Sequence, residues 1–174
     1  YLPGDKSISH RSVIFNSIAK GTAKVTNISL GQDCISTINI MRSMGVEVDI
    51  NETDLTTISI KGVGRTGLQE PEIVLDAGNS GTTMRLISGL LSAQPFFSVL
   101  TGDDSLRSRP MGRIIKPLLE MNSKISSNNN RLPLKISNTK LVGINYKLPV
   151  ASAQLKSAII LAALGAKGKT RITE

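Results

Sequence analysis

Three stretches of the sequence combine small polar residues with a cation and lead into an apolar run. They are residues 6–11, 78–85 and 151–156. Each has the composition of a helix N-terminus, where unpaired backbone N–H groups and the positive end of the helix dipole attract anionic oxygens. Three such helix openings that converged would form a binding site for phosphate or carboxylate groups.

Lys6 and Arg11 flank the first opening, with Ser7 between them. An arginine grips a carboxylate or phosphate with two parallel hydrogen bonds, while a lysine is a compact charge that can transfer a proton. Because Arg11 is a second cation nearby, we expect it to lower the pKa of Lys6 into a range suited to acid–base work. The alternative is an ordinary solvated helix end.

Single positions in these openings also have simpler interpretations. Ser7, Ser80 and Ser152 are each suited to be a plain N-cap. A further pair of cations, Arg107 and Arg109, lies in residues 106–111, which we predict to be a loop entering a helix whose first turn holds Pro110. These arginines are either a second anion clamp or surface charge.

Several kinds of site are excluded. The single cysteine, Cys34, cannot form an internal disulfide or a thiolate zinc site. The glycine-rich residues 62–67 follow a strand-like segment and predict a turn rather than a nucleotide-binding loop. An aromatic content of 3% argues against a stacking platform for nucleic acid.

Composition predicts a globular protein with an anionic partner. The chain has 174 residues, 40% of them hydrophobic, and a net charge of +8. Such a charge suits a phosphate metabolite, a nucleic acid or a membrane surface. The longest apolar run, residues 158–166, is too short to span a bilayer, and residues 1–6 are too polar for a signal-peptide core. We therefore predict a cytoplasmic location.

An internal repeat must position these openings. Arg11, Arg85 and Lys156 occupy equivalent places in three similar stretches, and the first two stretches continue into a second amphipathic run that stops at Gly45 or Asn122. Each unit is typical of a β–α–β–α–β–β order, and Ser126 to Asn130 is predicted to be a solvated hairpin tip. The third unit stops after its first helix and strand, so we expect the chain to be part of a longer protein.

Four segments resemble the motifs of the 5-enolpyruvylshikimate-3-phosphate synthase family: residues 2–11, 76–85, 107–111 and 152–154. Together they run along essentially the whole chain, and residues 152–154 with Leu86 resemble the second class of these synthases. The resemblance implies an inside-out α/β barrel, the enolpyruvyl transferase fold, whose third βαβαββ unit is incomplete here. Residues 1–5 would be a hinge segment and residues 6–174 the shikimate-3-phosphate-binding domain, with the C-terminal domain absent from this chain.

The resemblance also implies a function in the shikimate pathway, which makes chorismate for aromatic amino acid biosynthesis. The family's transferase reaction joins the enolpyruvyl group of phosphoenolpyruvate to the 5-hydroxyl of shikimate 3-phosphate and releases phosphate, without a metal or organic cofactor. Lys6 would be catalytic. The substrate-binding residues implied are Lys6, Ser7 and Arg11 at the hinge, Ser152, Ala153 and Gln154 for shikimate 3-phosphate, and Lys6, Gly81, Arg109 and Gln154 for phosphoenolpyruvate, with Asn79 and Thr82 beside them.

The family's acid–base carboxylates and further arginines lie in its C-terminal half, so we expect this chain alone to bind substrate without turnover. Its expected partners are the two small-molecule substrates and that C-terminal domain, not nucleic acid or a membrane. One alternative is UDP-N-acetylglucosamine enolpyruvyl transferase, which has Lys-Asn in place of Lys6-Ser7 and a reactive loop cysteine, whereas Cys34 is predicted to be buried at a helix start. Another is a non-catalytic, basic nucleic-acid-binding module.

Overall fold

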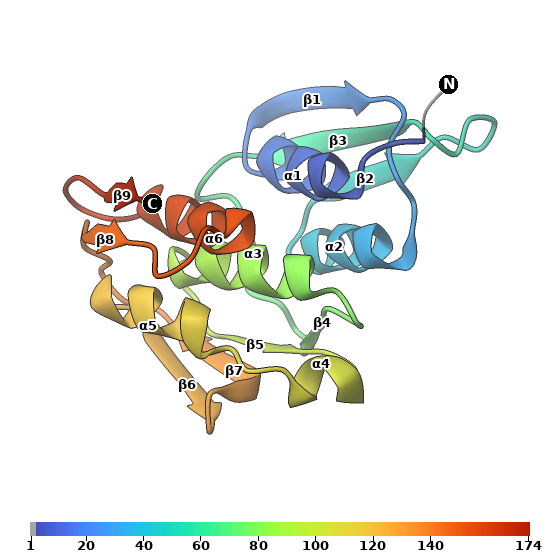
Figure 1. Ribbon diagram of the computed structural model, residues 1–174. Helices are drawn as coiled ribbons and strands as arrows, with labels where there is room; N and C mark the ends of the chain where they lie inside the picture. The colour runs from blue at the N-terminus through green and yellow to red at the C-terminus, as the bar shows by residue number, and fades with distance from the viewer. Residues whose placement is uncertain (1–2) are drawn as a thin grey trace.

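The computed structural model describes residues 3–174 (Figure 1), so Tyr1 and Leu2 of the predicted hinge and of the opening motif lie outside it. The helices are Lys6–Ser17 (α1), Gln32–Ser43 (α2), Gly81–Ser92 (α3), Asp104–Ser108 (α4), Gly112–Glu120 (α5) and Ala153–Ala163 (α6). The strands are Lys20–Val25 (β1), Glu47–Ile50 (β2), Ile58–Val63 (β3), Leu75–Asp76 (β4), Ser98–Thr101 (β5), Lys124–Asn128 (β6), Arg131–Ser137 (β7), Asn145–Lys147 (β8) and Arg171–Thr173 (β9).

The strands form separate sheets around the helices. Within residues 3–174 the sheet orders are β1-β3-β2, β4-β5-β7-β6 and β8-β9. Figure 1 shows these sheets at the periphery and α1, α3 and α6 between them, which is the inside-out arrangement predicted. β1 pairs antiparallel with β3 just as β5 pairs antiparallel with β7, so the first two units repeat in pairing as well as in sequence.

Three local predictions need correction. Residues 3–5 form no strand before α1. The segment 106–111 is not all loop, because Asp103 caps a short helix, α4, that contains Arg107, and Pro110 lies between α4 and α5 rather than inside the first turn. The hairpin tip is only Asn129 and Asn130, whose φ angles are 50° and 54°, because residues 124–128 belong to β6.

The second helices of the first two units stop where the sequence predicted. Gly45 and Asn122 follow α2 and α5 with φ angles of 85° and 69°, a left-handed conformation that these residue types adopt more readily than others. Each stop turns the chain into the next strand, β2 or β6. The point at which the second helix of each unit ends is therefore determined locally, by a residue type that tolerates positive φ.

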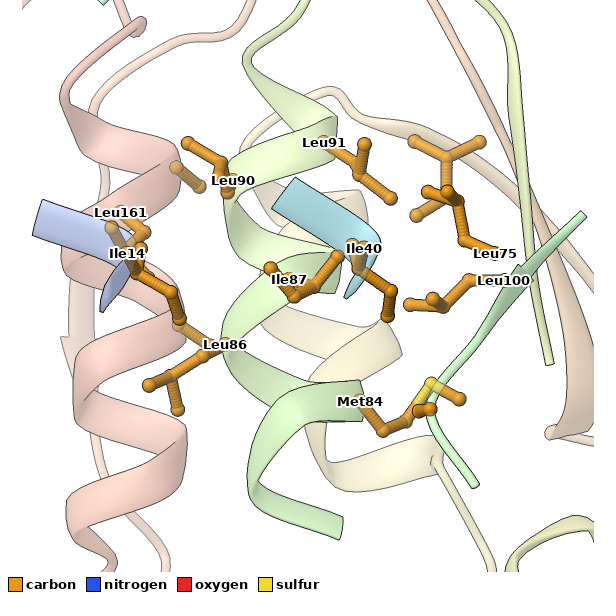
Figure 2. Close-up of a cluster of buried hydrophobic side chains, with 14 of the residues drawn as sticks. Ile14, Ile40, Leu75, Met84, Leu86, Ile87, Leu90, Leu91, Leu100 and Leu161 are labelled. Atoms are coloured by element: carbon orange, nitrogen blue, oxygen red, sulfur yellow. The ribbon is translucent and has the colours of Figure 1, made fainter. Parts of the chain in front are cut away.

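α3 is the central helix of the core. Its side chains are buried on all faces, as expected for a helix with neighbours on every side. Figure 2 shows Leu86 and Leu90 on the side facing α6, where Leu161 lies, and Leu91 on the side of Leu75 and Leu100. α3 contacts both α6 and the sheet that contains β4 and β5. Its burial therefore holds α6 and this sheet in place relative to each other.

α3 and α6 pack in parallel at very close range. Thr82 contacts Gln154 near the N-terminal ends, and Ala93 approaches Gly165 near the C-terminal ends. Between them Gly89 faces the backbone of Ala158, so closely that a Cβ on Gly89 would overlap the Ala158 carbonyl oxygen. No helix of the described chain is long and apolar enough to cross a membrane.

Gly89→Ala tests this close approach. We expect the added methyl group to separate α3 from α6 and to lower the free energy of unfolding by about 1–3 kcal/mol, measured by urea denaturation. Gly112→Ala is the matched control, because a Cβ there would meet its nearest neighbour, Asn130, at an ordinary 3.7 Å. Equal stability of the two variants would contradict the packing described.

Candidate functional site

The N-terminal ends of α1, α3 and α6 lie at the same end of the molecule (Figure 1). Contacts between the first two turns of these helices link them: Arg11 of α1 donates to the Ser157 hydroxyl of α6 at 3.0 Å, and Gln154 of α6 donates to the Thr82 hydroxyl of α3 at 2.9 Å. The three predicted openings are therefore brought together. Their dipoles point the same way, which makes this end electropositive.

Each opening has its own N-cap. The caps are Asp5 for α1, Ser80 for α3 and Ser152 for α6, each accepting a hydrogen bond from the backbone three residues on. Ser7 is therefore not a cap, unlike Ser80 and Ser152, and lies in the first turn of α1. The side chain of Ser7 is exposed and has no hydrogen-bond partner within residues 3–174.

The caps leave two backbone N–H groups unpaired at each opening. A cap satisfies the third N–H of its helix, and the first two have no intrahelical acceptor. Within the described part of the chain, none of these first two N–H groups has a partner. The residues that carry them are Lys6 and Ser7, Gly81 and Thr82, and Ala153 and Gln154. All six belong to the predicted site, so their N–H groups form a set of donors at one end of the fold.

Arg85 and Gln154 connect α3 to α6 beneath these donors. The Arg85 guanidinium donates to the Gly81 carbonyl at 3.0 Å and to the Gln154 Oε1 at 2.9 Å. Gln154 in turn donates from Nε2 to Thr82, so its amide is held at both ends. A Cβ on Gly81 would lie 2.6 Å from the Arg85 guanidinium, so a side chain there would require that guanidinium to move.

Arg109 is held beside the α3 opening. Its guanidinium donates to the Asn79 Oδ1 at 2.6 Å and to the Ser105 hydroxyl, and Asn79 donates to Asp103 at 2.7 Å. Hydrogen bonding from Asn79, more than the charge of Arg109, holds the pKa of Asp103 below its usual range. Arg107, the other predicted clamp residue, instead contacts Thr101 and is exposed.

Lys6 forms an ion pair with Asp33 of α2, with 2.9 Å between Nζ and Oδ2. The hydrogen bond to Asp33, followed by the charge of Asp33, raises the pKa of Lys6. The expectation that Arg11 lowers this pKa is therefore wrong: Arg11 points its guanidinium at the Ser7 carbonyl and at Ser157. Lys6 is therefore a protonated cation at neutral pH, suited to hold an anion rather than to act as a base.

A cavity of about 110 Å³ opens among α3, α5 and α6. It is lined by Arg85, Arg113, Ile114, Ser152, Gln154 and Leu155. Burial, and then the charges of Arg109 and Arg113, lower the pKa of Arg85. Since no carboxylate lines this cavity, an anionic oxygen would relieve the repulsion among the cations around it.

Several residues of this site were not predicted from the sequence. Asp33 was not proposed, although an acidic residue in the first turn of a helix is a common feature. Arg85 was identified as the equivalent of Arg11 in the repeat, and that equivalence would have placed it in the site. Arg113 and Ser157 reach the site only through the packing of α5 and α6, which no local pattern predicts.

A larger cavity, of about 350 Å³, lies near the opposite ends of α3 and α6 and includes Arg65, Gln94 and Gly165. Helix C-termini present carbonyl groups rather than N–H groups, so the anion-binding features are at the other end. Among residues 3–174, no cluster of three or more His, Cys, Asp or Glu side chains is arranged to hold a metal ion.

Comparisons with known proteins agree with this geometry. A family model described as EPSP synthase (3-phosphoshikimate 1-carboxyvinyltransferase) matches residues 1–174. Curated relatives named 3-phosphoshikimate 1-carboxyvinyltransferase include those of Herpetosiphon aurantiacus, 52% identical over 99% of this chain, and Bacillus cytotoxicus, 53% identical over 99%. The chain spans about 40% of the length of these relatives.

The fold has the same close match. A solved EPSP synthase from Acinetobacter baumannii superimposes on 99% of this chain with a TM-score of 0.95 and 49% sequence identity, and the match covers 40% of that structure.

The link between Thr82 and Gln154 is measurable by a double-mutant cycle. We expect Thr82→Val and Gln154→Ala each to lower the free energy of unfolding, and the double variant to lose less than the sum by about 0.5–1.5 kcal/mol, the net value of one hydrogen bond. Urea denaturation of the four proteins measures this. Additive losses would mean that the two side chains do not interact in solution.

Proposed function

Because the chain belongs to the EPSP synthase family, we propose that residues 6–174 form its shikimate-3-phosphate-binding domain, with residues 3–5 in the hinge to a second domain. The observation that carries the proposal is the gathering of three helix N-termini, with their unpaired N–H groups and cations, at one end of the fold. This arrangement suits two substrates that both carry phosphate and carboxylate groups.

We assign shikimate 3-phosphate to the α6 side of the site. The Ser152 hydroxyl and the N–H groups of Ala153 and Gln154 would hold its phosphate and ring. Arg85 and Arg113 beside the cavity supply compensating positive charge. A phosphate held by neutral donors and flanked by arginines is stabilised by charge-assisted hydrogen bonds, which are stronger than neutral ones.

Phosphoenolpyruvate would lie toward α1 and α3. Gly81 offers an unpaired N–H with no side chain to exclude a ligand, while Arg109, Asn79 and Thr82 border the same helix opening. Lys6 and Arg11 reach this region from α1, and the exposed Ser7 hydroxyl is available for a further bond. For Lys6 to bind an anion, its ion pair with Asp33 must loosen or be shared with that anion.

We propose that the whole protein transfers the enolpyruvyl group of phosphoenolpyruvate. The 5-hydroxyl oxygen of shikimate 3-phosphate bonds to C2 and loses its proton, while the methylene carbon gains one. Loss of a proton from the resulting methyl group then expels phosphate and restores the double bond. Lys6, kept protonated by Asp33, is suited to stabilise the anionic groups. It would supply a proton only after its contact with Asp33, which raises its pKa, is broken.

Closure of a second domain over these helix ends would exclude water and bring the reacting atoms together. This chain contributes the helix openings, whereas the carboxylate acid–base groups would come from the second domain. We therefore expect the chain alone to bind substrate but not to turn it over.

Calorimetric titration of this chain tests the proposal. We expect shikimate 3-phosphate to bind weakly, with a Kd on the order of 1 mM or about 4 kcal/mol, and shikimate without the phosphate to bind roughly tenfold less tightly or worse. Ser152→Ala, which removes the hydroxyl assigned to the phosphate, should reduce the difference between the two ligands. Lys61→Ala is the control, because Lys61 is exposed and pairs with Glu47 of the neighbouring strand in the β1-β3-β2 sheet, away from the helix openings.

Two results would contradict the proposal. One is equal affinity for the phosphorylated and unphosphorylated ligands, which would mean that no phosphate site exists. The other is steep, salt-dependent binding of a DNA duplex with no response to shikimate 3-phosphate, which would favour the nucleic-acid alternative. Release of phosphate by this chain alone from the two substrates would overturn the division of roles between the domains.

A further inference from the structure

A buried histidine lies directly beneath the site and has no role in the binding scheme above. His10 of α1 is fully buried. Its Nδ1 lies 2.7 Å from the Thr37 hydroxyl of α2. Its Nε2 has no hydrogen-bond partner among residues 3–174. A buried polar ring with one satisfied and one unsatisfied nitrogen needs an explanation.

The contact with Thr37 begins a chain of buried side chains. The Thr37 hydroxyl lies 2.7 Å from the Thr83 hydroxyl of α3, and Thr83 lies 2.7 Å from the hydroxyl of Ser80. Thr83 also reaches the backbone carbonyl of Asp33 at 3.2 Å. Thr37, Thr83 and Ser80 are as fully buried as His10. Three helices are thus joined by hydrogen bonds within the core.

The end of this hydroxyl chain away from His10 meets two parts of the site. Ser80 is the N-cap of α3 and so fixes the helix opening that carries the N–H groups of Gly81 and Thr82. Asp33, whose carbonyl accepts from Thr83, holds the Lys6 ammonium with its carboxylate. The hydroxyl chain therefore connects His10 to the groups that position two sets of anion-binding donors.

The lack of a partner for Nε2 indicates which ring nitrogen carries the proton, and hence the direction of each hydrogen bond in the hydroxyl chain. A buried N–H without an acceptor is rarer in proteins than a buried lone pair without a donor. We therefore infer that the ring is protonated on Nδ1 and that Nδ1–H donates to the Thr37 hydroxyl. Thr37 then donates to Thr83, and Thr83 to Ser80 or to the Asp33 carbonyl. In this order the hydroxyls of Thr37 and Thr83 each accept one hydrogen bond and donate another.

The environment keeps the ring neutral. Burial, together with the smaller effects of the positive charges of Lys6 and Arg11 and against an opposing effect of Asp33, lowers the pKa of His10 to about 4. A neutral ring holds a single donor on Nδ1 at physiological pH and adds no charge to the site. His10 is suited to orient its neighbours rather than to exchange protons with substrate.

We propose that His10 is a positioning residue: its Nδ1–H orders the Thr37–Thr83–Ser80 chain and so fixes the α2 and α3 openings relative to α1. The proposal rests on the proposed function for its consequence, since the donors it aligns are those assigned to the substrates. The alignment of the helix openings does not depend on a substrate, so it can be measured on the protein without any ligand.

The first test is ¹⁵N NMR of histidine-labelled protein, in which the single histidine gives one pair of ring resonances. We expect the Nδ1–H tautomer, with no titration between pH 8 and pH ~5. An Nε2–H tautomer, or a ring that titrates near its ordinary pKa of about 6.5, would overturn the proposal whether or not the chain binds shikimate 3-phosphate.

The second test compares three variants by amide NMR and urea denaturation. His10→Leu removes the donor, whereas His10→Asn places an amide nitrogen close to the position of Nδ1 and keeps it. Val13→Ala is the control, because Val13 is a fully buried apolar residue of the same helix. We expect the amide resonances of Gly81 and Thr82 to shift in His10→Leu, and to stay near their original positions in His10→Asn and Val13→Ala.

Affinity for shikimate 3-phosphate then links alignment to function. We expect His10→Leu to bind roughly tenfold more weakly, the equivalent of about one buried hydrogen bond, with the affinity retained in His10→Asn and in Val13→Ala despite the loss of stability in the latter. If the affinity of His10→Leu falls no more than that of an equally destabilised Val13→Ala, His10 is only structural. If the unmodified chain does not bind, the proposed function fails, and the amide shifts alone decide the role of His10.

Discussion

The parallel packing of α1, α3 and α6 is the constraint on which the structure depends. Parallel helices place like ends of their dipoles side by side, which is electrostatically unfavourable. Apolar burial offsets this cost, since α3 is buried on all faces. At Gly89, which has no side chain, the backbone of α3 comes into direct contact with the backbone of α6. The core thus holds together an arrangement that leaves one end of the molecule electropositive and rich in unpaired N–H groups.

The groups that connect the helix openings preserve this charge. Amides and hydroxyls make most of the links, as where Gln154 bridges Thr82 and Arg85 and where the buried hydroxyls continue from His10. The carboxylates near the openings have other partners: Asp33 pairs with Lys6, and Asp5 and Asp103 cap α1 and α4. Neutral links position the cations without cancelling their charge, so a bound anion is the natural counterion.

Local patterns predicted the elements better than their ends. The helix stops at Gly45 and Asn122 follow from the conformations these residues tolerate, and they were predicted correctly. The cap of α1 was not, because Asp5 and Ser7 are both good caps and only the path of the chain chooses between them. The short helix α4 was missed for a similar reason, since five residues are too few for a periodic pattern.

The sequence by itself determined the repeat, the three helix openings and the family motifs, because these depend on residue types at short spacings. Only the tertiary structure decided which cations meet which partners. Lys6 forms an ion pair with Asp33, so its pKa is raised by Asp33 and not lowered by Arg11. Arg85 and Arg113, which come from different helices, line one cavity. Such pairings join residues far apart in the chain, and the strength of a charge interaction depends on distance and burial, which no local pattern contains.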